Sequence, residues 1–230
     1  ALHLFTRPRR IPPQEQEQRL LLGGREQSVV HEGRRLRGWL WGDRGPRVLL
    51  VHGWDSRASH LGAFVPPLLE QGYQVLAYDA PAHGVSEGDR SHVLDIGRAL
   101  VRIHRENGPF EAIISHSVGS PASLYAFVNG FETRASVHIA GPASLRRVLV
   151  GFAHACRLAE EEVSDFLTLV AEHIGQPLDA MEAGALTRGM RHPALLLHDP
   201  EDREIPYGES LALKQVWPDA RLLDITEAGH

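Results

Sequence analysis

The feature that most constrains this chain is a serine at the end of a short apolar run, in the stretch AIISHSVGS at residues 112–120. Residues 112–115 are apolar or small, which is typical of a buried strand, and the apolar spacing of residues 118–128 is that of a helix. A serine at such a strand-to-helix corner adopts a strained backbone that projects its hydroxyl above the sheet. Small residues are needed two positions to either side, and here they are Ser115 and Gly119. The pattern therefore predicts that Ser117 is presented for chemistry, with a chance turn of small residues as the alternative.

Strands and helices alternate from residue 48 onward. The run at 48–51 is apolar on both faces, as in a strand that helices cover on each side. Further strands are predicted over residues 74–78, 112–115, 135–139, 193–198 and 221–225, and helices over 58–71, 91–106, 118–128 and 207–216. This alternation gives parallel strands joined by crossovers, so we predict an α/β fold, a three-layer sandwich with a mostly parallel sheet. Two extended runs before it, 27–31 and 36–41, predict a hairpin at the sheet edge.

The alternation stops between residues 142 and 191. Two amphipathic helices are predicted there, one beginning near Leu145 and one ending before Gly175. Ligands bind beyond the carboxyl ends of parallel strands, so we expect these helices to form a small cap over the rim that carries Ser117. The length of 230 residues favours a single domain over residues 1–230, with 142–191 as its cap insertion.

Residues 1–24 show no clear helical or strand period. They are rich in arginine, proline and glutamine and end in two glycines. We therefore expect a lead-in wrapped on the surface, with Arg7, Arg9 and Arg10 solvated in preference to forming a binding patch.

Composition excludes several classes of protein and site. A formal charge of −5 leaves no basic field for nucleic acid, and the single cysteine, Cys156, permits no internal disulfide. No spacing typical of zinc ligands occurs, and we expect neither a metal nor an organic cofactor. No run approaches the length of a membrane span, and the first residues lack the charge order of a signal peptide. We expect a cytoplasmic protein without membrane or nucleic-acid partners, whose oligomeric state the sequence leaves open.

A serine hydroxyl is a poor nucleophile at neutral pH. It needs a base within hydrogen-bond reach and a third group that orients the base, most often a histidine and a carboxylate. An acidic loop occupies residues 199–204, and only one histidine, His230, follows it. In the chain order serine, acid, histidine, His230 is therefore the candidate base for Ser117.

The sequence resembles the serine hydrolases of the α/β-hydrolase superfamily. The resemblance covers nearly the whole chain from residue 26 and rests on five segments in order, which are Val51-His52-Gly53-Trp54, residues 79–86, residues 115–119, residues 202–206 and Gly229-His230. It implies that Ser117 is the nucleophile and His230 the general base. The family's acid is followed, after two intervening residues, by an apolar residue and proline, which favours Asp202 as the acid that orients His230. Asp199 is the second choice, and its other interpretation is a turn-former before proline.

The resemblance also implies an oxyanion hole. Its donors would be the backbone N–H groups of Val118, beside the nucleophile, and Trp54. The indole of Trp54 either lines the pocket or only packs. The resemblance gives structural roles, holding loops by hydrogen bonds, to His52, His83, His116 and Asp79.

Two departures from the family pattern stand out. Ser115 replaces the first glycine of the corner, and Ser120 replaces a frequent later one. His230 is the last residue of this sequence, so the helix that normally follows and braces its loop is missing from it. We expect either that the sequence is a truncated record or that the base is poorly held.

The expected reaction is acyl transfer from a small ester-like substrate to water. Ser117 would form an acyl-enzyme, and His230 would activate water to release the acid. A carboxylic ester or thioester is favoured as the small-molecule acyl substrate, while peptide, lactone and carbon–carbon cleavage stay open because fold does not imply function. Two alternatives are a non-catalytic ligand-binding relative with an impaired triad and an interaction scaffold with a flat rim.

Overall fold

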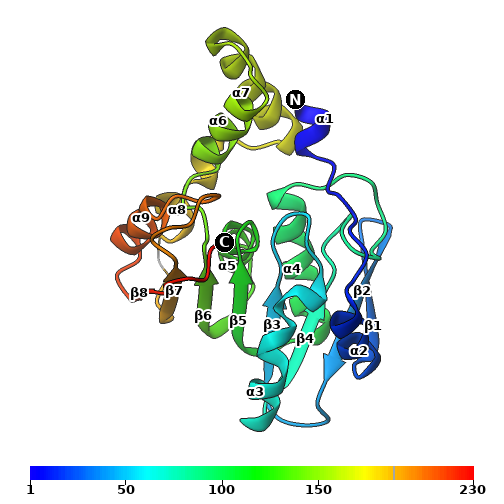
Figure 1. The fold of residues 1–230 in the computed structure, drawn as a ribbon. Helices are drawn as coiled ribbons and strands as arrows, with labels where there is room; N and C mark the ends of the chain where they lie inside the picture. Colours follow the sequence, from blue (N-terminus) through cyan, green and yellow to red (C-terminus); the bar gives the residue numbers. More distant parts are fainter. Residues whose placement is uncertain (189) are drawn as a thin grey trace.

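A computed structural model describes residues 1–188 and 190–230 and contains an eight-stranded sheet with helices on both faces (Figure 1). The strands are β1 (Arg25–His31), β2 (Arg34–Trp41), β3 (Arg47–Val51), β4 (Gln74–Tyr78), β5 (Phe110–His116), β6 (Thr133–Ile139), β7 (Ala194–His198) and β8 (Ala220–Asp224). Their order across the sheet is β1-β2-β4-β3-β5-β6-β7-β8. The β1–β2 hairpin joins β4 antiparallel at one edge, and all other neighbours are parallel. The predicted fold class and edge hairpin are confirmed.

Two helical layers cover the sheet. The helices are α1 (Leu2–Phe5), α2 (Glu15–Leu22), α3 (Val65–Glu70), α4 (Val93–Asn107), α5 (Gly119–Val128), α6 (Leu145–Ala155), α7 (Glu160–Ile174), α8 (Ala183–Leu186) and α9 (Gly208–Val216), with short 3₁₀ helices η1 (Ala58–Phe64) and η2 (Leu178–Met181). One core packs the sheet against η1 and α3, and the larger core packs its other face against α4, α5, α8, α9 and the cap. Among residues 1–188 and 190–230, no helix combines the length and apolar character needed to cross a membrane.

Strand β3 shows why the sheet is buried on both sides. Leu49 and Val51 belong to the larger core, and Val48 and Leu50 to the other. Successive strand residues point to opposite faces, so a strand between two helical layers must be apolar throughout. Burying each leucine side chain contributes about 2 kcal/mol to folding. Strand β3 is therefore held firmly in the sheet and anchors the loop that follows it.

The cap helices α6 and α7 lie above the carboxyl edge of the sheet, in the connection between β6 and β7 (Figure 1). Ser144 caps α6, because its hydroxyl accepts a hydrogen bond from the Arg147 N–H at 3.1 Å. The carboxylate of Glu209 in α9 accepts the N–H groups of Ala143 and Ser144 at 2.8 and 3.0 Å. Arg147 also pairs with Glu209. The point where the chain enters the cap is thus tied to the sheet domain.

The N-terminal residues differ from the expected featureless lead-in. They form the single-turn helix α1 and the two-turn helix α2, and α1 lies beside the cap (Figure 1). Arg9 pairs with Asp55 at 2.6 Å, and Arg10 donates to three backbone carbonyls of the loop after β4. Both arginines are exposed, as predicted, and they also hold the N-terminal residues through these contacts. Helix α1 is a single turn, which is too short to show a helical period in the sequence. It is stabilised by contacts with distant parts of the chain.

Candidate active site

Ser117 stands where β5 ends and α5 begins. Its φ of 50° lies in the left-handed region, a conformation that costs about 1–3 kcal/mol for a residue with a side chain. The Ser117 N–H donates to the Ile139 carbonyl of β6 at 2.9 Å, which holds the corner against the neighbouring strand. The strained serine predicted from the sequence is thus present.

The backbone around Ser117 is packed closely at two glycines, Gly119 and Gly53. A Cβ at position 119 would lie 2.8 Å from the carbonyl oxygens of both Val51 and His52. A Cβ at position 53 would lie 3.0 Å from the Cβ of Ser117. The start of α5 and the loop after β3 therefore touch at the serine, and this contact brings Trp54 beside it.

The two serines that replace glycine at the corner belong to a buried polar network. The Ser120 hydroxyl lies 2.8 Å from Nδ1 of His138 in β6, and the Ser115 hydroxyl lies 3.1 Å from the same nitrogen. Nε2 of His138 lies 3.0 Å from the hydroxyl of Ser136, which in turn lies 3.1 Å from Nε2 of His192. Apart from His192, every residue of this network is at most 1% exposed, namely Ser115, Ser120, Ser136 and His138.

One assignment of protons satisfies this network. Ser120 donates to Nδ1 of His138, Nε2–H of His138 donates to Ser136, and Ser136 donates to His192, while Ser115 donates to the Val137 carbonyl at 3.1 Å. Burial, reinforced by the charge of His192, lowers the pKa of His138 to about 3, so its ring is neutral as this assignment requires. The serines therefore fit the corner because β6 supplies a partner.

The three predicted residues Ser117, His230 and Asp202 meet at the carboxyl edge of the sheet. Nε2 of His230 lies 3.0 Å from Oγ of Ser117, and Nδ1 of His230 lies 2.9 Å from Oδ2 of Asp202. A carboxylate only accepts, so Nδ1–H donates to Asp202 and Nε2 is left to accept from the serine hydroxyl. These residues follow β5, β8 and β7, whose parallel carboxyl ends share one edge.

Asp202 is placed to stay ionised. Its side chain is buried, and Oδ1 accepts the N–H groups of Glu204 and Ile205 at 2.8 and 3.0 Å. Burial alone would raise the pKa of Asp202, but the hydrogen bonds from His230 and these two N–H groups outweigh it and hold the pKa below the ordinary value. The ring of His198, fully buried, also lies 3.3 Å from Oδ2 of Asp202.

Asp199, the second choice for the acid, holds the loop that carries His230. Its Oδ2 accepts the N–H groups of Ala228 and Gly229, both at 2.8 Å. Hydrogen bonds from the N–H groups of Glu201 and Gly229 lower the pKa of Asp199, so the acceptor is charged. The sequence suggested a second-choice acid or a turn-former at this position and did not suggest this role, because nothing in the sequence shows that residues 199 and 228–229 meet.

The backbone N–H groups of Trp54 and Val118 flank the serine from the two touching loops. Val118 is the N-cap of α5, where N–H groups point out of the helix. Within residues 1–188 and 190–230, neither N–H donates a hydrogen bond to another protein group. Free backbone N–H donors close to a nucleophile are what an oxyanion would need.

The other singled-out residues hold loops or pack. His52 donates to the Gly53 carbonyl at 2.7 Å and accepts from the Ala80 N–H at 2.9 Å. Asp79 accepts the N–H groups of Ala58 and Val85, both at 2.8 Å, and burial raises its pKa. Two further histidines differ from each other: His83 donates to the Pro81 carbonyl at 2.9 Å, whereas His116 packs its ring 4.8 Å from that of His230.

A cavity of about 510 Å³ opens beside Ser117, within the size range of small-molecule sites. Most of its wall is apolar and comes from α5, the cap helix α6, the loop after β3 and the N-terminal residues. The indole of Trp54 both lines the cavity and packs, since its ring stacks on Phe5 at a centroid distance of 6.4 Å. The rim is therefore hollow, unlike the flat surface of a scaffold.

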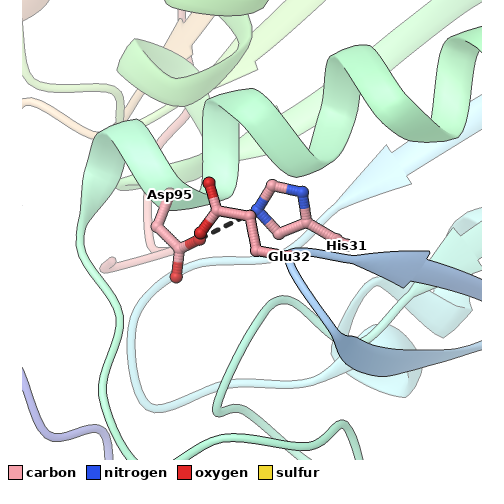
Figure 2. Close-up of side chains that lie close together, drawn as sticks. All are labelled: His31, Glu32 and Asp95. Atoms are coloured by element: carbon pink, nitrogen blue, oxygen red, sulfur yellow. Dashed lines mark hydrogen bonds and ion pairs between the residues drawn. The ribbon is translucent and has the colours of Figure 1, made fainter.

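One cluster elsewhere has the residue types of a cation site. His31, Glu32 and Asp95 lie together where the β1–β2 hairpin meets the start of α4 (Figure 2). Asp95 already accepts two hydrogen bonds from Arg34, at 2.7 and 2.9 Å, and one from His31 at 2.9 Å. Burial would raise the pKa of Asp95, but His31 and Arg34 outweigh it and lower the pKa. The cluster acts as a salt-bridge network that fixes α4 beside the cavity.

Known proteins share this architecture. The profile of the alpha/beta hydrolase family matches residues 48–230. The structure of an esterase from Pyrococcus furiosus is similar with a TM-score of 0.71 at 21% identity, over 98% of this chain and 90% of that one. A thioesterase domain from the curacin biosynthetic pathway is similar with a TM-score of 0.67 at 16% identity, over 90% and 93% of the two chains. Alpha/beta hydrolase domain-containing protein 10 from mouse is similar with a TM-score of 0.68 at 18% identity, over 90% of each chain.

At these identities the likeness to solved structures shows the fold. No curated protein gives a significant sequence match. The family match covers four-fifths of the chain, from β3 to His230, and leaves out the N-terminal residues and the edge hairpin.

Proposed function

Because the chain belongs to the alpha/beta hydrolase family, we propose that it is a serine hydrolase that cleaves a small ester-like substrate, a carboxylic ester or a thioester, through an acyl-enzyme on Ser117. The observation that carries the proposal is the continuous hydrogen-bonded path from Oγ of Ser117 through His230 to Asp202, at 3.0 and 2.9 Å. This path opens into an apolar cavity, as a site for an acyl group should.

In the first half of the reaction, Oγ of Ser117 attacks the carbonyl carbon while Nε2 of His230 takes the hydroxyl proton. The carbonyl oxygen becomes an oxyanion, which the N–H groups of Trp54 and Val118 stabilise. The tetrahedral intermediate then collapses and the bond from carbon to the leaving oxygen or sulfur breaks. His230 gives its proton to that atom, and the acyl-enzyme remains on Ser117.

In the second half, water takes the place of the departed alcohol or thiol. Nε2 of His230 accepts a proton from the water, whose oxygen attacks the acyl carbon. Collapse of the second intermediate breaks the bond to Oγ, the proton returns to Ser117, and the carboxylic acid leaves. In each half the charge on Asp202 stabilises the protonated ring of His230 and fixes its tautomer.

Turnover of short-chain p-nitrophenyl esters by the wild type and by Ser117→Ala tests the proposal. We expect the substitution to lower kcat by about a millionfold, because the three side chains act as a unit. The free N–H donors and the cavity do not supply a nucleophile, so no comparable rate should survive. Equal rates in the two proteins would overturn the proposal and favour the alternative, a non-catalytic relative that binds a ligand in the same cavity.

A further inference from the structure

The N-terminal segment, defined here as residues 4–9, forms part of the cavity wall. Leu4, Phe5, Arg7 and Arg9 all line the cavity that contains Ser117. The segment lies outside the part of the chain that matches the family, which begins at residue 48. The segment therefore adds wall, from outside the matched region, to the space in which the proposed reaction takes place.

The segment is held in place at several points. Thr6 is 1% exposed, and its carbonyl accepts the Ser91 N–H at 2.9 Å. The backbone N–H and the guanidinium of Arg9 both donate to the carboxylate of Asp55 at 2.6 Å. The ring of Phe5 lies within 5.2 Å of Phe152 in the cap, centroid to centroid. The segment is thus an ordered wall that bridges the sheet domain and the cap.

The charges on the cavity wall do not cancel. Arg7, Arg9, Asp55 and His92 are its charged or titratable members. Arg9 and Asp55 neutralise each other, and Nδ1 of His92 accepts the Asp95 N–H at 3.3 Å. Burial lowers the pKa of His92 to about 4, so its ring is neutral. Within the part of the chain that the structure describes, the Arg7 guanidinium has no hydrogen-bond or ion-pair partner.

We infer that the cavity takes an anionic ester or thioester, whose apolar part lies against the hydrophobic wall and whose carboxylate or phosphate binds Arg7. This inference rests on the proposed function and names the substrate class. An arginine fork binds carboxylates and phosphates in a bidentate manner, and Arg7 is exposed to solvent on one side while it lines the cavity on the other. The anionic group belongs either to the acyl chain or to the leaving group.

Three substrates of similar acyl length separate these sources. They are p-nitrophenyl octanoate, which is neutral, the p-nitrophenyl monoester of suberic acid, which carries a carboxylate on the acyl chain, and octanoyl coenzyme A, which carries phosphates on the leaving group. We measure kcat/KM for each with the wild type, Arg7→Gln and the control Arg44→Gln. Arg44 is exposed, lies in the loop between β2 and β3 at the opposite end of β3 from Ser117, and gives the same change in net charge.

We expect Arg7→Gln to lower the ratio of kcat/KM for one anionic substrate over the neutral ester by about tenfold. A fall with the suberate ester places the anion on the acyl chain, and a fall with octanoyl coenzyme A places it on the leaving group. Added salt should lower the same ratio in the wild type and leave it nearly constant in Arg7→Gln.

Unchanged ratios in Arg7→Gln, or an equal fall in Arg44→Gln, would overturn the inference. Turnover of the neutral ester by Ser117→Ala distinguishes a failure of the proposed function from a failure of the inference about substrate class. Persistent turnover in that variant means that the proposed function has failed. Loss of turnover there, together with unchanged ratios in Arg7→Gln, means that only the substrate class is wrong.

Discussion

The corner around Ser117 and the N-terminal segment contribute to one cavity but are held by different means. At the corner, backbone segments approach closely at Gly53 and Gly119, and a buried network around His138 supports the serines of the same corner. The N-terminal segment is a single helical turn and a short extended stretch, held by an exposed ion pair, a few backbone hydrogen bonds and aromatic contacts.

The difference separates chemistry from the choice of substrate. Backbone packing leaves little freedom, so the corner can hold one geometry and change of a residue there should affect every substrate alike. The N-terminal segment contributes side chains that can change without moving a strand. Substitutions in it should therefore alter the ratio of rates between substrates. The predictions that follow test whether the corner determines the chemistry and the N-terminal segment the choice of substrate.

Among substitutions other than that of the nucleophile itself, the largest effect is expected from Asp202→Asn. The amide keeps the size of the side chain but can donate a hydrogen bond, which favours the tautomer of His230 that cannot accept from Ser117. We expect kcat to fall by about ten-thousandfold for neutral and anionic esters alike. Steady-state kinetics with both substrates check this, and a fall confined to one of them would break the division.

The next largest effect is expected on stability, from His138→Ala. The substitution leaves a cavity and removes the partner of Ser120 and Ser115, so the free energy of unfolding should fall by about 3 kcal/mol. Urea unfolding measures it. His154→Ala, in the half-exposed part of α6, is the control and should change stability by less than about 0.5 kcal/mol. A loss no larger than the control's would show that the network does not support the corner.

The buried histidines also predict how stability depends on pH. The pKa of His138 is lowered to about 3 and those of His92 and His116 to about 4, all chiefly by burial. Below about pH 6.5 these side chains take up protons in the unfolded chain and not in the native one, so the free energy of unfolding should fall as the pH falls. Urea unfolding at about pH 7.5 and about pH 5.5 tests the sign, and equal stability at both would contradict it.

A smaller effect on turnover is expected from Asp199→Ala. The loop that carries His230 loses two charge-assisted hydrogen bonds, so the imidazole is held less accurately and kcat should fall by about 10- to 100-fold. Asp199 is a positioning residue, so KM should change little. Glu201→Ala, at an exposed neighbouring position, is the control. A rise in KM with kcat unchanged would show that the loop binds substrate instead.

The smallest effect is expected from Phe5→Ala. Loss of the ring removes apolar wall, so kcat/KM for the octanoate ester relative to the acetate ester should fall by about fivefold. Leu22→Ala changes a residue that is 86% exposed on α2 and serves as the control. Equal slowing of both esters would show that the N-terminal segment supports the chemistry itself and not the choice of substrate.

Local patterns were enough to predict the sheet and the corner. The strand at β4 was predicted with its observed bounds, Gln74–Tyr78, because apolar runs between turn-formers leave few alternatives. The meeting of Ser117, His230 and Asp202 followed from the shared edge of parallel strands and from the family resemblance. Their distances could not be predicted, since they depend on loops whose paths are set by tertiary contacts.

The missed features all join residues that are distant in sequence. Asp199 holds residues 228–229, His138 satisfies serines of another strand, and Phe5 reaches the cap. The apolar residues of α1 span one turn, so they carry no period that could be recognised. Contacts of this kind appear only when the fold brings the segments together.

The most direct measurement is covalent labelling with a fluorophosphonate, mapped by mass spectrometry of the digested protein. The account predicts one adduct, on the peptide that contains Ser117, and labelling at least about a thousandfold slower in His230→Ala, because the base no longer activates the hydroxyl. An adduct on another residue, or equally fast labelling in His230→Ala, would contradict it.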